Sequence, residues 1–280
     1  MRYGAASIRL LNLHGQDYNG TNEQRAMMVV KRGKLMTILT QDQFLDGKVR
    51  LSQPSEGYRA AIDPVFLAAA ITVKPGQRVL DVGCGVGAAA LCLAARVPAC
   101  RVVGMELQPD LLSLAWDNAA NNGVDDRVHF IQGDLADPPA AVVPGGFDHV
   151  MTNPPYMEHG TQSPHDGKAL ANHEAELSLT DWVRNCVALL APKGVFTMVH
   201  RADRLDDILM ALHGRTGDIA ILPLWPKRGR PAKRVLIRAR KGLRSPTQLL
   251  PGMVLHADDG RYTPVAEAVL RHGDGIDWAI

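Results

Sequence analysis

A regular alternation of short apolar runs and amphipathic segments begins after residue 76 and constrains the fold more than any other feature of the chain. The apolar runs predict strands at 78–82, 101–105, 127–132, 147–152 and 195–200. The amphipathic segments predict helices at 88–96, 109–122, 177–190 and 205–212. Strands that alternate with helices form a mostly parallel sheet covered on both faces. We therefore predict an α/β, Rossmann-like fold.

Two further apolar runs, at 219–224 and 234–239, have no amphipathic segment between them. Parallel neighbours need a long crossover connection, and the stretch between these runs is too short for one. One of the two strands must therefore run antiparallel. The prediction is a seven-stranded sheet in which one strand is antiparallel and the others are parallel.

The sequence outside the alternation is less regular. Residues 1–40 are polar and basic with glycine breaks, so we expect a loosely ordered N-terminal extension. Residues 41–245 are expected to form the α/β domain, and residues 246–280 a C-terminal tail that packs on or near it. Residues 45–53 alternate apolar and polar side chains, which predicts a short strand or hairpin arm.

The composition is that of an ordinary globular protein, and the net charge of +2 says nothing about partners. The four cysteines form no C-x-x-C pair, and no histidine–cysteine spacing suits zinc. We therefore predict reduced, mostly buried thiols and no metal site. No apolar stretch suits a signal peptide or a membrane span, which predicts a cytoplasmic protein without membrane contact.

A glycine-rich turn follows the first strand of the alternation. It reads Asp81-x-Gly83-x-Gly85-x-Gly87. Glycine permits the sharp turn into the helix and lets a ligand approach the backbone, but with Ala88 the same residues also fit the G-x-G-x-x-G/A pattern of dinucleotide enzymes. Glu106 ends the second strand, where its carboxylate can accept hydrogen bonds from both hydroxyls of a ribose in either kind of protein.

Asp81 separates the two possibilities. A carboxylate two residues before the first glycine can pair with the cationic amino-acid end of S-adenosylmethionine, whereas it would repel a pyrophosphate. Asp134, after the third strand, is placed to accept a hydrogen bond from the adenine amino group of that cofactor, although a turn also favours aspartate for local reasons. Leu107 and Leu135, which follow Glu106 and Asp134, complete the predicted cofactor site together with Asn153 after the fourth strand.

The fourth strand runs directly into a proline-rich tetrapeptide. It reads Asn153-Pro154-Pro155-Tyr156. Two consecutive prolines exclude a helix and fix an extended backbone without amide donors. Ligands of open α/β sheets bind at the carboxyl ends of the strands, where the glycine turn also lies. We therefore expect a rigid turn beside the cofactor site.

This turn suits methyl transfer to an amino nitrogen. An exocyclic amino group is a poor nucleophile because its lone pair is delocalised. Two acceptors aimed at its hydrogens localise the lone pair and stabilise the positive charge that develops during attack. The expected acceptors are the side-chain oxygen of Asn153 and the carbonyl of Pro154, while Tyr156 offers a ring face to a flat base or amide.

The glycine turn, Glu106, Asp134 and the tetrapeptide together resemble the class I amino methyltransferases. More narrowly, residues 43–242 resemble the bacterial tRNA (adenine-N6)-methyltransferase group and the related small methyltransferase-domain proteins. The resemblance implies the class I methyltransferase fold, S-adenosylmethionine as cofactor and N6 of adenine in tRNA as methyl acceptor. The tetrapeptide alone does not name the substrate, because adenine, guanine and glutamine methylators share it.

The segment 57–70 resembles the lead-in segment of the same group, which lines the cofactor pocket there. This chain has Ile62-Asp63-Pro64 where the commoner form is Thr-Asp-Gly, so a direct cofactor contact by Pro64 is not carried over. Asp63 is expected to cap a helix that Pro64 opens.

The segment from Trp225 to Arg244 contains nine Lys or Arg and no acidic residue. Gly229 and Pro231 predict a loop, with Trp225 at its base. Such a basic loop is a candidate contact for RNA phosphates, although a solvated hairpin would have the same composition. The predicted RNA contacts are Lys227, Arg228, Arg230 and Lys233.

Four other functions share part of this sequence pattern. Glutamine-N5 protein methyltransferases carry a separate helical domain before the catalytic one, and rRNA guanine-N2 methyltransferases carry a duplicated domain; neither is visible in this sequence. An NAD-binding dehydrogenase would need an acid–base residue and a substrate domain beyond the fold. A non-catalytic RNA-binding protein would have no use for Asp81, Glu106 and Asn153 together.

Overall fold

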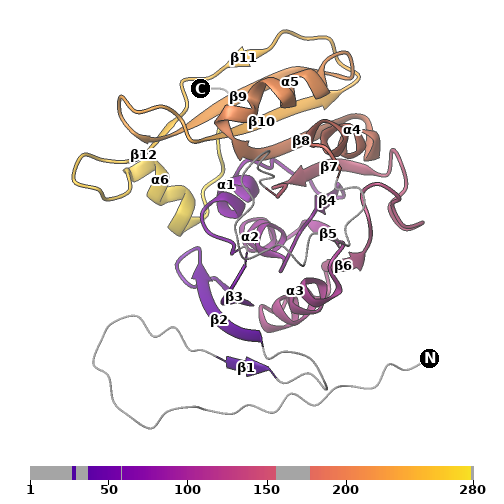
Figure 1. The fold of residues 1–280 in the computed structure, drawn as a ribbon, viewed down its shortest axis with the longest axis vertical. Helices are drawn as coiled ribbons and strands as arrows, with labels where there is room; N and C mark the ends of the chain where they lie inside the picture. Colours follow the sequence, from indigo (N-terminus) through magenta and orange to yellow (C-terminus); the bar gives the residue numbers. More distant parts are fainter. Residues whose placement is uncertain (1–26, 30–36, 58, 156–176, 279–280) are drawn as a thin grey trace, which may run out of the picture.

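The computed structural model describes residues 27–29, 37–57, 59–155 and 177–278 (Figure 1). Its centre is a nine-stranded sheet with the order β11-β9-β10-β8-β7-β4-β5-β6, in which β12 also pairs with β9. The strands are β4 (Arg78–Val82), β5 (Arg101–Glu106), β6 (Val128–Gln132), β7 (Phe147–Thr152), β8 (Leu190–Arg201), β9 (Thr216–Lys227), β10 (Arg234–Lys241), β11 (Gln248–Leu249) and β12 (Met253–His256). The helices are α1 (Asp63–Ala69), α2 (Ala88–Arg96), α3 (Pro109–Asn121), α4 (Leu179–Leu189), α5 (Leu205–Leu212) and α6 (Pro264–Glu267).

The topology confirms the predicted fold. Strands β6, β5, β4, β7 and β8 are parallel neighbours, and β10 runs antiparallel to both β8 and β9. The sheet exceeds the predicted seven strands because β11 and β12, which lie after residue 245, add to its edge beside β9. Both are short, and their residues carry little of the alternation that marks a strand in a sequence.

Two hydrophobic cores cover the faces of the sheet. Helices α1, α2 and α3 pack on one face, and α4 and α5 pack on the other. Successive strand residues alternate between them, so Val79 joins the first core and Leu80 the second. The predicted helices agree closely with α2, α3, α4 and α5, but β8 begins earlier than predicted. Pro192 is accommodated in an irregular stretch in which Lys193 has a φ of 63°.

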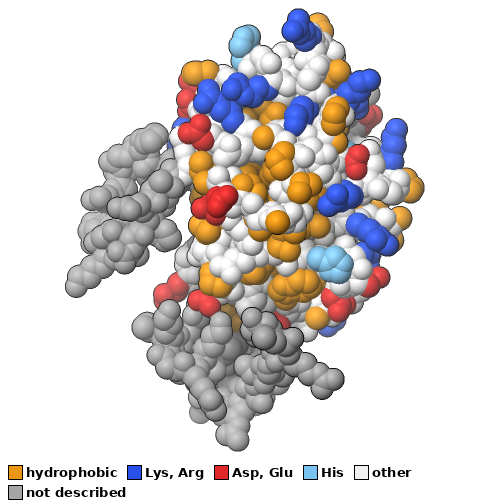
Figure 2. Space-filling view, turned by 90° about the vertical axis from the view of Figure 1, so that its right-hand side faces the viewer, with side chains coloured by type: hydrophobic (Ala, Val, Ile, Leu, Met, Phe, Trp, Pro, Cys, Tyr) orange, Lys and Arg blue, Asp and Glu red, His pale blue; other side chains and the backbone are white. Residues whose placement is uncertain are grey.

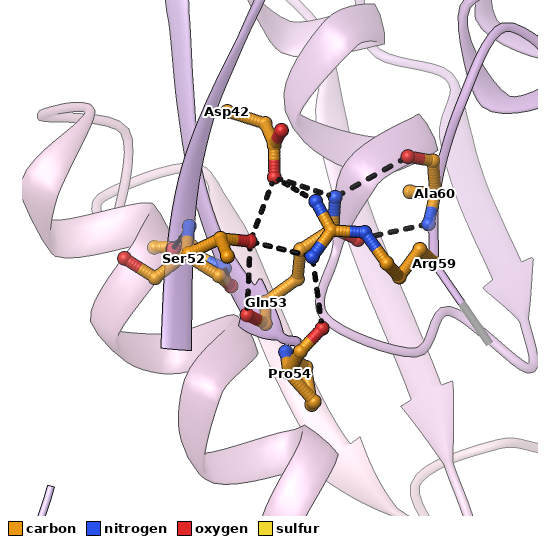
Figure 3. Close-up of polar contacts among 8 residues, drawn as sticks. Asp42, Ser52, Gln53, Pro54, Arg59 and Ala60 are labelled. Carbon is orange, nitrogen blue, oxygen red and sulfur yellow. Dashed lines mark hydrogen bonds and ion pairs between the residues drawn. The ribbon is translucent and has the colours of Figure 1, made fainter. Parts of the chain in front are cut away.

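An antiparallel hairpin precedes the main sheet. Its strands are β2 (Thr37–Phe44) and β3 (Val49–Pro54), and β1 (Met27–Val29) pairs with β2. The predicted hairpin arm is present, although residues 45–48 form its turn. Arg59 ties the lead-in segment to the hairpin, because its guanidinium donates to Asp42 Oδ2 at 2.8 Å and to Thr40 Oγ1 at 2.6 Å (Figure 3).

The lead-in helix begins one residue earlier than expected. Asp63 is its first residue and Ile62 occupies the cap position, so the prediction that Asp63 caps the helix was wrong. The Asp63 carboxylate is instead paired with the Arg234 guanidinium, Nε to Oδ2 at 3.0 Å. A long-range ion pair thus replaces the local cap that the sequence suggested.

The residues after β12 return to the first core. The backbone amide of Ile276 donates to Ala69 O at 2.8 Å, and the indole of Trp278 donates to Ala70 O at 2.9 Å. The four cysteines are buried and none is in a disulfide. No helix in the described ranges is long and apolar enough to cross a membrane. The predicted N-terminal extension lies mostly outside those ranges.

Candidate active site

The carboxyl ends of the parallel strands bring the predicted site residues to one edge of the sheet. β4 and β7 are direct neighbours, and Val82 lies opposite Thr152 at their ends. The residue that follows each strand belongs to the predicted site: Gly83 follows β4 and Asn153 follows β7. Strand pairing therefore places the glycine turn beside the proline-rich turn.

The glycines of the turn serve different needs. Gly83, Gly85 and Gly87 all have positive φ, at 68°, 56° and 88°. A Cβ at Gly87 would lie 2.7 Å from Phe130 Cζ, so packing excludes a side chain there. A Cβ on Gly85 would meet no atom within 4 Å, which leaves its backbone open to a ligand.

Glu106 connects the glycine turn to the start of α3. Its side chain is buried, and Oε2 accepts from the backbone amide of Gly85 at 2.9 Å. Oε1 accepts from the amide of Gln108, also at 2.9 Å. These bonds fix the carboxylate beside the turn, and a carboxylate oxygen can accept more than one hydrogen bond. The geometry suits a group that also presents acceptors to ribose hydroxyls.

The Asp81 carboxyl lies deeper than the sequence suggested. It is 2% exposed, and Oδ2 has no hydrogen-bond partner among the described residues. Burial and, to a smaller extent, the nearby charge of Glu106 raise the pKa of Asp81 to about 7, against the lowering effect of the Ala90 backbone amide. A buried acid of this kind would be stabilised in its ionised form by a cation close by.

The remaining predicted cofactor residues differ in exposure. Leu107 is 50% exposed next to Glu106, where an apolar contact for a ligand ring would lie. Asp134 is exposed, and Oδ1 accepts from the amide of Ala136 at 2.8 Å, a local turn contact. Leu135 is buried in the second core, so the structure gives its side chain a packing role.

The proline-rich turn is anchored through the strand that precedes it. Thr152 Oγ1 donates to Val82 O at 2.9 Å and accepts from the indole of Trp182 at 3.0 Å. Asn153 is half-buried, Pro154 is buried and Pro155 is exposed. Tyr156 lies outside the described residues, so its predicted role stays a prediction.

Sequence reasoning missed two side chains that hold the site. Asn118 of α3 is fully buried; it accepts from the amide of Ser52 at 2.8 Å and donates to Val86 O in the glycine turn at 3.0 Å. It therefore links the hairpin to that turn. Trp182 of α4 is the second; its indole is hydrogen-bonded to Thr152 and packs against Gly83. An asparagine or tryptophan within an amphipathic segment gives no signal of such long-range bonds.

The basic loop emerges at the same edge as Asn153. Arg234, the first residue of β10, lies opposite Arg201, the last residue of β8, so β10 begins at the carboxyl edge. The turn between β9 and β10 therefore projects from this edge. Its exposed cations are Lys227, Arg228, Arg230 and Lys233. Trp225 lies within β9, and its indole donates to Pro251 O at 3.1 Å, which ties the base of the loop to the C-terminal segment.

The arginines farther along β10 are already engaged. Arg234 pairs with Asp63, the guanidinium of Arg238 lies 4.8 Å from the centroid of the Trp278 ring, and Arg240 pairs with Asp218 at 3.3 Å. By contrast, Arg228, Arg230 and Lys233 make no ion pair with any residue that the structure describes. Those three cations are thus open to an anionic ligand.

The fold is that of a class I methyltransferase. The crystal structure of a predicted O-methyltransferase from Agrobacterium tumefaciens has the same fold, with a TM-score of 0.65 at 22% sequence identity. The match covers 76% of this chain and 98% of that one. The model of the family described as "Methyltransferase small domain" matches residues 61–204. The chain belongs to this methyltransferase small domain family.

Two curated relatives carry the same name, tRNA1(Val) (adenine(37)-N6)-methyltransferase. The protein of Aeromonas hydrophila is 32% identical over 211 residues, which cover 73% of this chain and 85% of the relative. The protein of Porphyromonas gingivalis is 30% identical over 240 residues, which cover 80% and 91%. The chain is accordingly a methyltransferase whose cofactor is S-adenosylmethionine.

The buried carboxyl of Asp81 makes stability depend on pH in a specific direction. Its pKa is about 7 in the folded chain against the ordinary value of 3.8. Between these values the unfolded chain has released the proton that the folded chain still holds, so stability falls as the pH rises. Asp81→Asn cannot release this proton, so its free energy of unfolding relative to the wild type should rise with pH in this window, by about 1 kcal/mol per pH unit. Urea unfolding at about pH 5 and about pH 7 measures the difference; a gap independent of pH would contradict the raised pKa.

Proposed function

We propose that this enzyme transfers a methyl group from S-adenosylmethionine to N6 of adenine in RNA, and that the RNA is a tRNA. The observation that carries the proposal is the position of Asn153 directly beside the glycine turn, at the edge from which the basic loop also projects. The names of the two curated relatives support adenine and tRNA.

The cofactor site that we propose is built on the ends of β4, β5 and β6. S-adenosylmethionine supplies an electrophilic methyl group on a positively charged sulfur. Gly83, Gly85 and Gly87 shape the backbone against it, and Glu106 accepts from its ribose hydroxyls while Gly85 N and Gln108 N hold the carboxylate in place. Asp81 contributes a carboxyl beneath the turn, which a nearby cation favours in its ionised form.

Two further contacts complete the proposed cofactor site. Leu107 offers an exposed apolar side chain, and Asp134 offers a carboxylate whose Oδ2 can accept from an adenine amino group while Oδ1 keeps its turn contact. Leu135 contributes through the backbone that follows Asp134, since its side chain is buried in the core.

The catalytic step that we propose needs no strong base. Asn153 Oδ1 and the carbonyl of Pro154 would accept hydrogen bonds from the two hydrogens of the target amino group, which would localise the nitrogen lone pair for attack on the methyl carbon. The sulfur–methyl bond would break as the nitrogen–carbon bond forms, and the cofactor would leave as a neutral thioether. Positive charge then develops on the nitrogen, and both acceptors stabilise it. The methylated nitrogen is acidic and loses its proton to solvent. Pro155 keeps the turn extended, and Tyr156 is proposed to stack on the adenine.

The RNA contact that we propose is the turn between β9 and β10. Its exposed cations can neutralise phosphates while the adenine reaches Asn153 at the same edge. Exposed basic residues also occur away from the turn, among them Lys74 and Arg101. Figure 2 shows Lys and Arg side chains along the upper part and right edge of one face, with hydrophobic side chains over its middle. A test of the turn therefore needs a control with the same change of charge.

Glu106→Gln tests the cofactor site. The amide keeps the size of the side chain but cannot accept at both ends, so cofactor affinity should fall by about 1.5–3 kcal/mol, the range for hydrogen bonds to a charged group. Titration calorimetry with S-adenosylmethionine measures the change. Asp117→Asn, an exposed position on α3, is the matched control. Unchanged affinity in Glu106→Gln would remove this residue from the site.

Asn153→Ala tests the catalytic turn. The acceptor acts mainly on charge that develops in the transition state, so turnover should fall by about 10²–10³ while cofactor affinity changes little. A single-turnover assay with saturating S-adenosylmethionine and tRNA separates the two effects. Asn121→Ala, an exposed asparagine at the end of α3, should retain full turnover. A variant at Asn153 with near wild-type turnover would falsify the proposed mechanism.

Neutralising the basic turn tests the RNA contact. Replacing Lys227, Arg228 and Arg230 with Gln should weaken tRNA binding and reduce the log–log salt slope by about 0.7–0.9 for each phosphate that the variant no longer neutralises. Cofactor affinity should not move. The control replaces Lys74, Arg101 and Lys193, three exposed cations at the amino edge. An equal loss of affinity in both triple variants would indicate that only total charge matters.

A further inference from the structure

The indole of Trp182 packs on the glycine turn and is hydrogen-bonded to the end of β7, directly before the proline-rich turn. Its Nε1 donates to Thr152 Oγ1 at 3.0 Å, directly before Asn153. Its six-membered ring lies over the glycine turn, since a Cβ built on Gly83 would be 3.1 Å from Cζ2 and 3.2 Å from Cη2. One side chain of α4 thus packs on the glycine turn and is hydrogen-bonded to the last residue of β7, which precedes the proline-rich turn.

Thr152 completes this connection. The hydroxyl is fully buried, and it donates its single hydrogen to Val82 O at 2.9 Å while it accepts from Trp182. The chain Trp182–Thr152–Val82 therefore joins the residue before Asn153 to the residue before Gly83. Bonds made in a buried, low-dielectric setting are directional and costly to break.

The first turn of α4 holds the indole in place. Ser178 caps the helix, with Oγ accepting from the amide of Asp181 at 3.1 Å, and the amide of Trp182 donates to Ser178 O at 2.8 Å. The next residues toward the sheet, Val183 and Cys186, are fully buried in the second core. Trp182 is thus carried by a rigid element and not by a loop.

We infer that Trp182 is a positioning residue: its N–H, acting through Thr152, sets where Asn153 stands relative to the glycine turn, and so governs the rate of methyl transfer. This inference rests on the proposed function of Asn153. Methyl transfer requires the attacking nitrogen and the methyl carbon to be in line at close range, and a misplacement of about 1 Å can cost up to about a hundredfold in rate. Neither cofactor binding nor RNA binding requires the same accuracy.

Trp182→Phe is the sharpest variant, because phenylalanine keeps a ring over Gly83 and removes only the donor. We expect kcat for tRNA methylation to fall by about tenfold or more. The dissociation constant of S-adenosylmethionine, the KM for tRNA and the melting temperature should stay close to wild type. Trp116→Phe, an exposed tryptophan on α3, is the control and should leave kcat unchanged.

Thr152→Val removes the shared hydroxyl and tests the route. If Trp182 acts through this hydroxyl, Thr152→Val should lower kcat as Trp182→Phe does, and the double variant should be no slower than the slower single variant. The inference would be overturned if the two substitutions lowered kcat independently, so that their factors multiply in the double variant. A kcat of Trp182→Phe within twofold of wild type would also overturn it. A fall in kcat matched by an equal loss of cofactor affinity would also overturn it, since it would indicate general loosening of the glycine turn.

The two proposals fail in different ways in this experiment. If wild-type protein methylates tRNA but Trp182→Phe is equally fast, the positioning role is wrong and the proposed function stands. If wild-type protein methylates another amino acceptor, the same variants are compared on that acceptor, and only the proposed substrate is wrong.

Discussion

The pairing of β4 with β7 is the constraint on which the rest of this enzyme depends. Adjacent strands lie about 4.8 Å apart, so the ladder that sets Val82 opposite Thr152 also fixes the separation of the turns that follow them. Three further side chains hold the glycine turn in this position. Glu106 holds the glycine turn from the side of β5, Asn118 holds it from the side of the hairpin, and Trp182 packs on it from α4.

Charge is distributed at this edge in two layers. The acidic groups Asp81 and Glu106 are buried at and beneath the glycine turn, where a cationic cofactor would be favoured. The open cations lie at the rim, on the turn between β9 and β10, where an anionic polymer can reach them without entering the site. The ion pair of Arg234 with Asp63 joins β10 to the lead-in helix. A cationic small molecule and a polyanion can thus be bound at one edge.

The fold could be predicted from the sequence, and candidate site residues could be assigned to the ends of strands, because both follow from local rules. Alternating periodicity located the parallel strands, and prolines and glycines marked the turns at their ends. The sequence could not show that Asp81 is enclosed, because burial depends on α2 folding back over the strand. Nor could it show the Trp182–Thr152 bond, whose partners lie 30 residues apart and meet only when α4 packs on the sheet. The extra strands β11 and β12 escaped notice because their short segments are strands only through pairing with β9.

We propose that Asn153, beside the glycine turn, accepts a hydrogen bond from an adenine amino group of RNA. The most direct measurement incubates the purified chain with S-adenosylmethionine carrying an isotopic methyl label and a panel of unmodified tRNA transcripts, then analyses the nucleosides by mass spectrometry. We expect the label to appear in N6-methyladenosine, in a subset of the transcripts. Label found only in N2-methylguanosine, or only in glutamine of an added protein fraction, would contradict it.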